Sequence, residues 1–271
     1  MIFEIVPNLS EGRDAATIDA AVAAVERTGA RVLDRSSDAV HHRSVLTIAG
    51  DAAEVLDASI ALAGVALERI DLRAHRGVHP RIGALDVLPF VPLRDATLQD
   101  AAALARRAGA AIWERYGIPC FFYGAAAREE ARRLLPDIRR NAAWQPDEGG
   151  VLRHPTAGAV AIGARDVLIA FNVELATDDV ATAGEIARAV RESGGGLRSL
   201  RALAFARGPG CVQVSLNVTD HTATPLHRVV ELIELLAAQR GIEVRGSELV
   251  GCIPWSAAQT AAAYYLGVSR L

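Results

Sequence analysis

Two hydrophobic patterns alternate along the chain. Short runs rich in β-branched residues indicate strands, and longer stretches with apolar positions three and four residues apart indicate amphipathic helices. In the first helical stretch Ile18, Ala21, Val22 and Val25 have this spacing, and Gly29 ends it. The pattern predicts strands over residues 2–6, 31–34, 44–48, 86–91, 118–123, 159–162, 166–172, 200–206, 211–218 and 242–246. It predicts further helices over 52–69, 97–115, 179–193 and 224–239, with a terminal helix from Ser256.

The middle of the chain separates two such series. A short helix ended by Pro136 is expected after Arg128, followed by a connector that leads to residues 148–150. The runs 159–162 and 166–172 then suggest a hairpin. The length of 271 residues is itself about twice that of an average domain.

Strands and helices in this order predict an α+β protein, with helices on one face of a mostly antiparallel sheet. We expect two ferredoxin-like α/β-sandwich subdomains, an N-terminal one over residues 1–177 and a C-terminal one over residues 178–271. A glycine-rich phosphate loop between a strand and a helix is absent from the sequence, which disfavours nucleotide-dependent kinases and dehydrogenases.

Composition excludes several classes of protein. Hydrophobic residues make up 51% of the chain and charged residues 23%, which favours a globular core over disorder. The net charge of −3 and the lack of a basic tract argue against nucleic acid as a partner, and no apolar run is long enough to suggest a membrane span. Cys120, Cys211 and Cys252 lie in apolar stretches and predict buried thiols in a reducing compartment, so we expect a cytoplasmic protein.

Ionisable residues are densest in a segment that also contains Gly77, Pro80 and Gly83, and loops of this kind often hold catalytic side chains. They are Arg73, His75, Arg76, His79, Arg81 and Asp86. His75 and His79 have the spacing of a helical metal pair, but Gly77 and Pro80 disfavour a regular helix there. We therefore expect no metal, and a zinc hydrolase is the weaker alternative.

A second group of polar residues surrounds the dipeptide His41-His42. Asp34 and Asp38 precede it and Arg43 follows it. Neighbouring residues on a strand point to opposite faces, so at most one of the two histidines faces a given cleft. His221 and His227, near the start of a later helix, are interpreted as structural.

Several motifs, in this order, resemble those of glutamate formimidoyltransferases. They are Val6-Pro-Asn-Leu-Ser-Glu-Gly-Arg13, His79-Pro-Arg-Ile-Gly-Ala-Leu-Asp-Val-Leu-Pro-Phe90, Tyr123-Gly-Ala-Ala-Ala-Arg128, Ala164-Arg-Asp-Val-Leu-Ile-Ala-Phe-Asn172, Gln213-Val-Ser-Leu-Asn217 and Gly246-Ser-Glu-Leu-Val-Gly251. The resemblance implies transfer of a formimidoyl group from N-formimidoyl-L-glutamate to N5 of tetrahydrofolate, in histidine degradation. It also implies a substrate cleft between the subdomains, tetrahydrofolate as co-substrate and a homodimer. A cyclodeaminase fused to this unit in some relatives is expected here as a separate protein, because the chain ends at Leu271.

The resemblance also implies the residues of the site. His79 occupies the position of the catalytic histidine, and Asn8 and Asp38 belong to the active site, with Asp34 and Asp86 as alternatives to Asp38. The folate-binding stretch corresponds to Gly149, Gly150, Val151, Leu152, Arg153, His154, Pro155, Thr156, Ala157 and Gly158.

The chemistry of this transfer suits these residue types. The formimidoyl group is an amidine that is already electrophilic when protonated, so its transfer requires a group that moves protons, and histidine titrates near neutral pH. Arg43, Arg76 and Arg81 are candidates to bind substrate carboxylates. Two alternatives remain, a folate-dependent transferase with another formyl or formimino donor and a folate-binding protein without catalysis.

Overall fold

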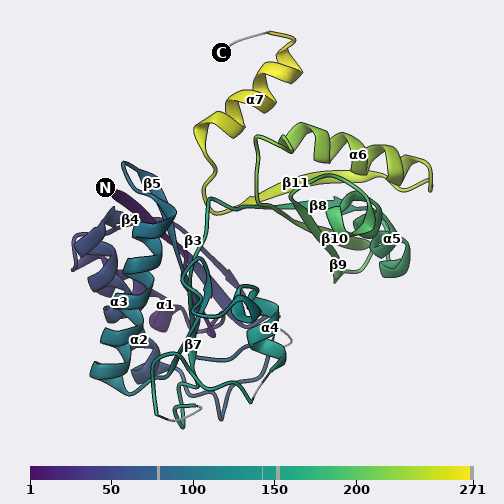
Figure 1. Ribbon diagram of the computed structural model, residues 1–271. Helices are drawn as coiled ribbons and strands as arrows, with labels where there is room; N and C mark the ends of the chain where they lie inside the picture. The colour runs from purple at the N-terminus through teal and green to yellow at the C-terminus, as the bar shows by residue number, and fades with distance from the viewer. Residues whose placement is uncertain (78–79, 142, 151–152, 269–271) are drawn as a thin grey trace. The chain divides into compact units, whose positions relative to one another are not determined.

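The computed structural model describes residues 1–77, 80–141, 143–150 and 153–268. It divides into two compact units, Met1–Asp166 and Val167–Leu271 (Figure 1). The sequence pattern places the end of the first subdomain at residue 177, whereas the first compact unit ends at Asp166. Strand β8 (Ile169–Leu175) lies between these two positions and belongs to the sheet of the second unit. Within the described ranges, no helix combines the length and the apolar character needed to cross a membrane.

The first unit contains a ferredoxin-like core. In chain order it consists of β1 (Ile2–Ile5), β2 (Asn8–Leu9), α1 (Ala15–Glu26), β3 (Arg31–Asp38), β4 (Arg43–Asp51), α2 (Ala52–Arg69) and β5 (Leu85–Arg94). Strands β1 and β2 are successive parts of a strand broken at Pro7, and both lie between β4 and β5. The order is thus β3, β4, β1 with β2, and β5, with antiparallel neighbours, as in a split βαβ sandwich.

Two parallel strands extend this core beyond β5. α3 (Leu98–Tyr116) leads to β6 (Cys120–Gly124), and β7 (Val160–Ala164) lies between β5 and β6 and is parallel to both. The hairpin predicted for residues 159–162 and 166–172 is therefore wrong, because β7 and β8 belong to different sheets. Periodicity identifies both strands but does not show which sheet each one joins.

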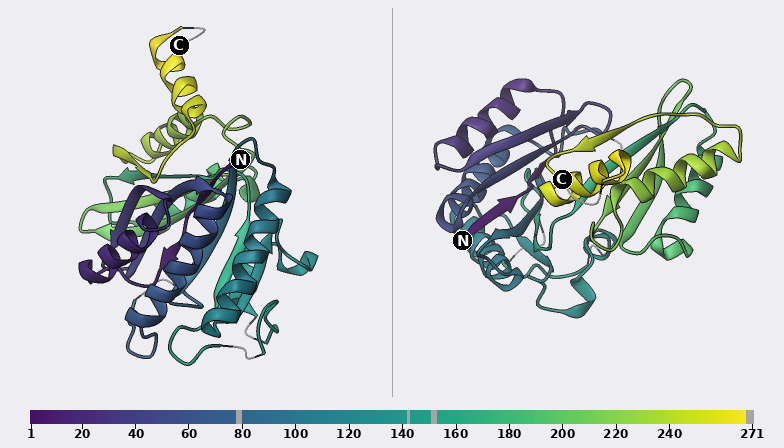
Figure 2. Two further views of the ribbon diagram at one scale, coloured as in Figure 1. Left: turned by 90° about the vertical axis from the view of Figure 1, so that its left-hand side faces the viewer. Right: turned by 90° about the horizontal axis from the view of Figure 1, so that it is seen from above.

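Helices α1, α2 and α3 cover one face of the first sheet, and the left view of Figure 2 looks onto this layer. The side chains that cap their N-termini are those of Asp14, Asp51 and Thr97. Such caps satisfy backbone N–H groups of the first turn and fix where each helix begins. The helices bury Phe90 and Phe122 completely, and burial of one such ring contributes about 1.5–3 kcal/mol to stability.

The opposite face of this sheet carries a smaller apolar cluster that includes Tyr123. The short helix α4 (Leu135–Arg140) packs against it through Ile138. The prediction that Pro136 ends a helix is wrong, since Pro136 lies in the first turn of α4, after a 3₁₀ turn over Glu130–Arg132. Proline is favoured in a first turn because no helical acceptor exists there for an N–H group.

The second unit repeats the ferredoxin-like order of strands and helices. Its elements are β8, α5 (Val180–Val190), β9 (Leu200–Gly208), β10 (Cys211–Val218), α6 (Leu226–Ala238), β11 (Val244–Val250) and α7 (Trp255–Leu266). The strands lie in the order β11, β8, β10, β9, and neighbours are antiparallel. Helices α5 and α6 form the core of this unit with one face of the sheet. The predicted α+β fold class is confirmed.

The cysteines differ in their burial. Cys120 is completely buried in β6, and desolvation raises the pKa of its thiol, so its interpretation as a core residue is confirmed. Cys211 is partly buried, and Cys252, which follows β11, is exposed. The expectation that all three thiols are buried holds only in part for Cys211 and is wrong for Cys252, because an apolar neighbourhood in sequence does not determine exposure.

Candidate active site

The turn after β2 lies directly against the hairpin between β3 and β4. Gly12 N donates a hydrogen bond to His42 Nδ1 at 3.1 Å. A Cβ atom on Gly12 would lie only 2.3 Å from Asp38 O and 2.6 Å from Arg43 N, both of them backbone atoms. The close approach of these two segments therefore depends on glycine at this position.

Replacing Gly12 with Ala is expected to lower the free energy of unfolding by about 1–3 kcal/mol, because the added methyl group forces the turn away from the hairpin. Urea denaturation followed by tryptophan fluorescence measures this change. Gly208→Ala is the control, since a Cβ atom there meets nothing within 4 Å. Equal effects of the two substitutions would contradict the tight packing of Gly12.

Arg43, at the start of β4, joins two other residues of the predicted site. Its Nε and Nη2 atoms donate hydrogen bonds to Asn8 Oδ1 at 3.0 and 2.6 Å, and its Nη1 atom donates one to Asp86 Oδ2 at 2.6 Å. The side chain of Asp86 has no exposed surface, and that of Arg43 is 14% exposed. The structure thus brings together Asn8, Arg43 and Asp86, which are far apart in the sequence.

A β-bulge positions the Asp86 carboxylate. Two successive residues of β2 pair with Leu85 and Val87, so Asp86 is an extra residue in β5. Its Oδ1 atom accepts a hydrogen bond from Ile82 N at 2.7 Å, and its Oδ2 atom accepts a second one from Arg139 Nη2 of α4, also at 2.7 Å. Sequence reasoning missed Arg139 because nothing in the spacing distinguishes it from the other arginines near it.

The carboxyl group of Asp86 has a pKa below its ordinary value of 3.8. Burial acts to raise this pKa, but the Arg43 and Arg139 guanidiniums and the Ile82 amide together outweigh burial. The ionised carboxylate therefore stabilises the fold at any pH above the pKa that Asp86 has in the unfolded chain. This stabilisation is lost as the pH falls through the lower pKa of the folded state.

We expect the native protein to lose stability more steeply than Asp86→Asn as the pH falls below about 4. The reason is that the unfolded state binds a proton at Asp86 in this range before the folded state does. Free energies of unfolding from urea titrations at several acidic pH values would measure the two slopes. Parallel slopes would contradict this assignment.

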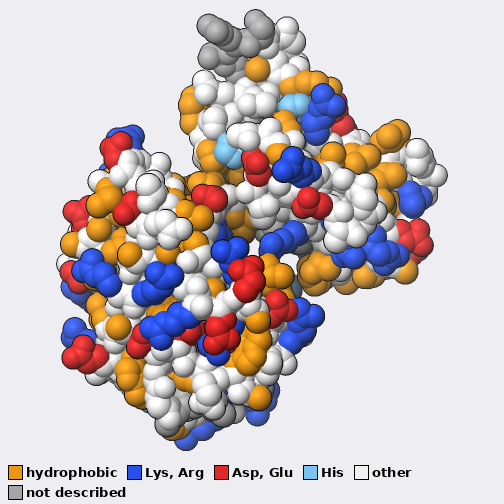
Figure 3. Space-filling model, viewed as in Figure 1, with side chains coloured by type: hydrophobic (Ala, Val, Ile, Leu, Met, Phe, Trp, Pro, Cys, Tyr) orange, Lys and Arg blue, Asp and Glu red, His pale blue; other side chains and the backbone are white. Residues whose placement is uncertain are grey.

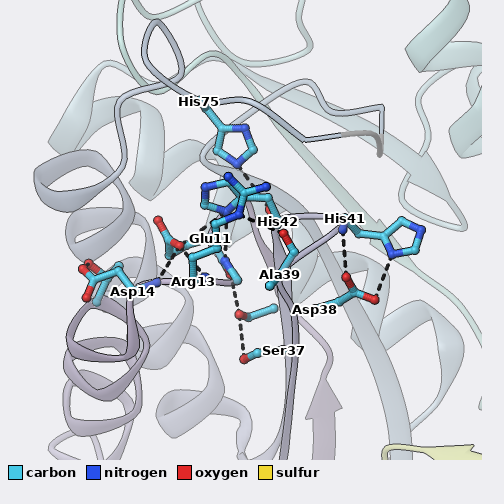
Figure 4. A network of polar contacts seen from close by, with 12 residues as sticks. Glu11, Arg13, Asp14, Ser37, Asp38, Ala39, His41, His42 and His75 are labelled. Carbon is cyan, nitrogen blue, oxygen red and sulfur yellow. Dashed lines mark hydrogen bonds and ion pairs between the residues drawn. The ribbon is translucent and has the colours of Figure 1, made fainter. Parts of the chain in front are cut away.

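Two imidazole rings lie against each other beside this site, those of His42 and His75, with centroids 4.0 Å apart and their planes tilted by 33° (Figure 4). Burial lowers the pKa of His42 more than the neighbouring Glu11 carboxylate raises it. Because His42 Nδ1 also accepts the hydrogen bond from Gly12, we assign a neutral ring at neutral pH. Its 3.4 Å contact with Glu11 Oε1 is then not an ion pair.

Asp38 is the last residue of β3, where the turn to β4 begins. Its Oδ1 atom accepts hydrogen bonds from Val40 N and His41 N, both at 2.8 Å, and its Oδ2 atom lies 2.9 Å from His41 Nδ1. Burial acts to raise the pKa of Asp38, but the hydrogen bonds lower it overall. As Figure 4 shows, His41 points toward Asp38 while His42 points toward His75.

The loop between α2 and β5 forms a cavity of about 330 Å³ with Arg153 of the expected folate-binding stretch. Its lining residues are Leu72, His75, Arg76, Gly77, Arg81 and Arg153. Arg81 Nη1 contacts the ring of His75, at 2.8 Å from Nε2, and Arg76 Nη1 donates to His75 O at 2.8 Å. Three arginines in one small cavity favour an anionic ligand.

Backbone contacts connect the same loop and the expected folate-binding stretch. Leu72 N donates to Thr156 O at 2.9 Å, and Ala84 N donates to Ala157 O at 2.8 Å. A Cβ atom on Gly158 would lie 2.2 Å from Ile82 O, so the two segments approach as closely as glycine permits.

The remaining residues of this stretch occupy different positions. His154 Nδ1 accepts hydrogen bonds from the backbone N–H groups of Thr156 and Ala157, which form a turn. Pro155 is exposed in this turn. Gly149 lies at the start of the stretch beside Pro119, and Gly150 is exposed. Three predicted site residues, His79, Val151 and Leu152, lie outside the described residues.

Charged side chains of both signs are mixed over the visible face of the first unit (Figure 3). The sequence contains no lysine, so every side chain with a permanent positive charge is an arginine. In the part of the chain that the structure describes, no three His, Cys, Asp or Glu side chains are placed together as metal ligands.

Comparison with known proteins shows the family. Residues 2–165 match the sequence profile of the formiminotransferase domain, N-terminal subdomain, and residues 170–271 match that of the formiminotransferase domain. The chain belongs to the formiminotransferase family. The resemblance inferred from the sequence motifs is confirmed.

Members of the formiminotransferase family similar to this chain are of two kinds. Glutamate formimidoyltransferase of Streptococcus pyogenes is 39% identical over 98% of the chain and 94% of the relative, and that of Thermoplasma acidophilum is 40% identical over 98% and 92%. Formimidoyltransferase-cyclodeaminase of Gallus gallus is 37% identical over the whole chain, which spans 53% of that relative.

Proposed function

We propose that this chain is a glutamate formimidoyltransferase, which transfers the formimidoyl group of N-formimidoyl-L-glutamate to N5 of tetrahydrofolate and releases L-glutamate. Relatives with this name are 39% and 40% identical over 98% of the chain. The observation that carries the proposal is the cavity in which Arg76 and Arg81 meet Arg153 of the expected folate-binding stretch. Both proposed substrates carry carboxylates that such a cavity can bind.

His79 is proposed as the general base and then the general acid. The transfer forms a bond between the formimidoyl carbon and N5 and breaks the bond between that carbon and the glutamate nitrogen. One proton therefore leaves N5 and one reaches the departing nitrogen, and an imidazole with an ordinary pKa of about 6.5 can accept and return it. Gly77 and Arg81, two residues away on either side in the sequence, line the cationic cavity, which supports this role.

Asp38 is proposed as the carboxylate that stabilises the positive charge of the amidine. The alternative, Asp86, has no exposed side-chain surface and forms ion pairs with Arg43 and Arg139, so its oxygens are not open to a substrate. The Asp38 side chain is 51% exposed, and its lowered pKa keeps it ionised at neutral pH. An exposed, ionised carboxylate can approach a cationic substrate, whereas Asp86 serves to position Arg43.

The expected folate-binding stretch, Gly149–Gly158, is proposed to bind tetrahydrofolate as co-substrate. Its described residues support this role, because Arg153 lines the cavity and the turn at His154 is tied by backbone hydrogen bonds to the loop that precedes β5. Oriented binding of both substrates lowers the entropic barrier to their reaction. The homodimer, the cytoplasmic location and the cleft between subdomains stay predictions.

A coupled assay tests the proposed function. Purified protein, N-formimidoyl-L-glutamate and tetrahydrofolate are mixed with an added cyclodeaminase, and the absorbance of the methenyl product is followed. We expect a signal that requires all four components. A signal only with formimidoylaspartate, or release of glutamate from formylglutamate in the presence of tetrahydrofolate, would identify another donor, and tetrahydrofolate binding without turnover would support a binding protein instead.

A further inference from the structure

A cluster of three charged side chains with a net positive charge is almost completely buried in the first unit. Arg43 Nη1 and Arg139 Nη2 both donate to Oδ2 of Asp86, at 2.6 and 2.7 Å. The side chains of Arg43 and Arg139 are only 14% and 19% exposed. Two guanidiniums and one carboxylate leave a formal charge of +1 in a region where water screens charge poorly.

The two arginines differ in how many hydrogen bonds the protein gives them. Arg43 uses all three of its nitrogens on Asn8 and Asp86. Arg139 makes one hydrogen bond, to Asp86, and its Nε atom is buried without an acceptor in the described part of the chain. A guanidinium has five N–H groups, so Arg139 retains most of its capacity to bind an acceptor.

Among the described residues, the neighbours of Arg139 do not supply a second anion. Tyr123 is buried, and desolvation raises the pKa of its phenol to about 12, so the group is neutral. Arg165 adds another positive charge near Tyr123. Within the described residues, Asp86 is the carboxylate that forms an ion pair with Arg139. The surroundings of Arg139 therefore favour binding of an anionic ligand to its guanidinium group.

We infer that Arg139 binds a carboxylate of the amino-acid substrate N-formimidoyl-L-glutamate, an inference that rests on the proposed function. Asp86 holds Arg139 beside Arg43, which also contacts Asn8, and both Asn8 and Arg43 are predicted residues of the site. A guanidinium donates to a carboxylate through two parallel hydrogen bonds, which fix the orientation of the ligand as well as its affinity. The tail of tetrahydrofolate also carries carboxylates, so the experiment must show which of the two substrates Arg139 binds.

Arg139→Gln tests this inference, because it leaves Asp86 paired with Arg43 and the Ile82 amide. We expect the KM for N-formimidoyl-L-glutamate to rise at least about 10-fold, since a hydrogen bond to a charged group contributes about 1.5–3 kcal/mol. The KM for tetrahydrofolate and kcat should change little. Arg140→Gln is the matched control on the same helix, because the Arg140 side chain is 74% exposed and pairs with Asp137.

Substrate analogues identify the carboxylate concerned. N-formimidoyl-4-aminobutyrate lacks the α-carboxylate, and N-formimidoyl-2-aminobutyrate lacks the γ-carboxylate. For one of the two, kcat/KM should be the same in the native protein and in Arg139→Gln. Equal losses with every donor, or a rise confined to the KM for tetrahydrofolate, would overturn the inference.

A binding measurement separates this inference from the proposed function. Glutarate, a dicarboxylate that resembles the glutamate product, should raise the Tm of the native protein and of Arg140→Gln but not that of Arg139→Gln. If the coupled assay shows no transfer while this difference persists, the proposed function fails and carboxylate binding stands. An equal shift of Tm in Arg139→Gln overturns the inference. The Tm without ligand shows whether each variant is folded.

Discussion

Replacing His79 with Ala is expected to lower kcat for formimidoyl transfer by roughly 10²–10⁴-fold, which is the usual contribution of a positioned general acid or base. The loss follows because the substitution removes the group proposed to move the proton from N5 to the departing nitrogen. Affinity for tetrahydrofolate should change little, since the arginines of the cavity and the stretch Arg153–Gly158 are untouched. The coupled assay gives kcat, and equilibrium titration gives the affinity.

His221→Ala is the control for this substitution. His221 is partly exposed in the second unit, where it contacts Ser256 Oγ at 3.1 Å, and its loss should leave kcat unchanged. Added imidazole should restore part of the activity of His79→Gly, because a diffusible base can replace the lost ring. Undiminished kcat in His79→Ala would remove this residue from the mechanism.

Replacing Asp86 with Ala is expected to lower the free energy of unfolding by about 3–5 kcal/mol, because the substitution leaves two guanidiniums in a nearly buried position without their common acceptor. Activity should fall as well, since Arg43 and Arg139 lose the contact that positions them. Urea denaturation at neutral pH measures the change in stability. Circular dichroism checks that the variant is folded before its activity is interpreted.

Asp19→Ala provides the comparison with an exposed ion pair. Asp19 pairs with Arg35 at 2.5 Å, but their side chains are 62% and 55% exposed. Solvent screens such a pair, so we expect a loss of less than about 1 kcal/mol. A similar loss for Asp19→Ala and Asp86→Ala would show that burial does not strengthen the Asp86 interactions.

Local chemistry made much of the fold predictable from the sequence. The predicted helix over residues 52–69 has the same bounds as α2, because Asp51 and Glu54 form a capping box at its start. The assignment of strands to sheets was less predictable. β7 and β8 are close in sequence and similarly apolar, and only long-range pairing places them in different sheets.

The candidate site was predictable where a motif marked it. Asn8 and Asp86 lie in recognisable motifs, Arg43 follows the His41-His42 dipeptide, and the structure places the three in contact. Arg139 lies on a helix of six residues with no distinguishing pattern, and its contact with Asp86 depends on how α4 packs across the sheet. Hydrophobic periodicity carries no information about such a contact.

The shared carboxylate of Asp86 has a consequence for how the protein is made. Arg43 precedes it by 43 residues and Arg139 follows it by 53, so closing this contact requires chain segments that leave the ribosome at different times. A nascent chain that ends before α4 contains the first two partners and lacks the third. Completion of the binding site is therefore expected late in synthesis, after β1 to β5 have already paired.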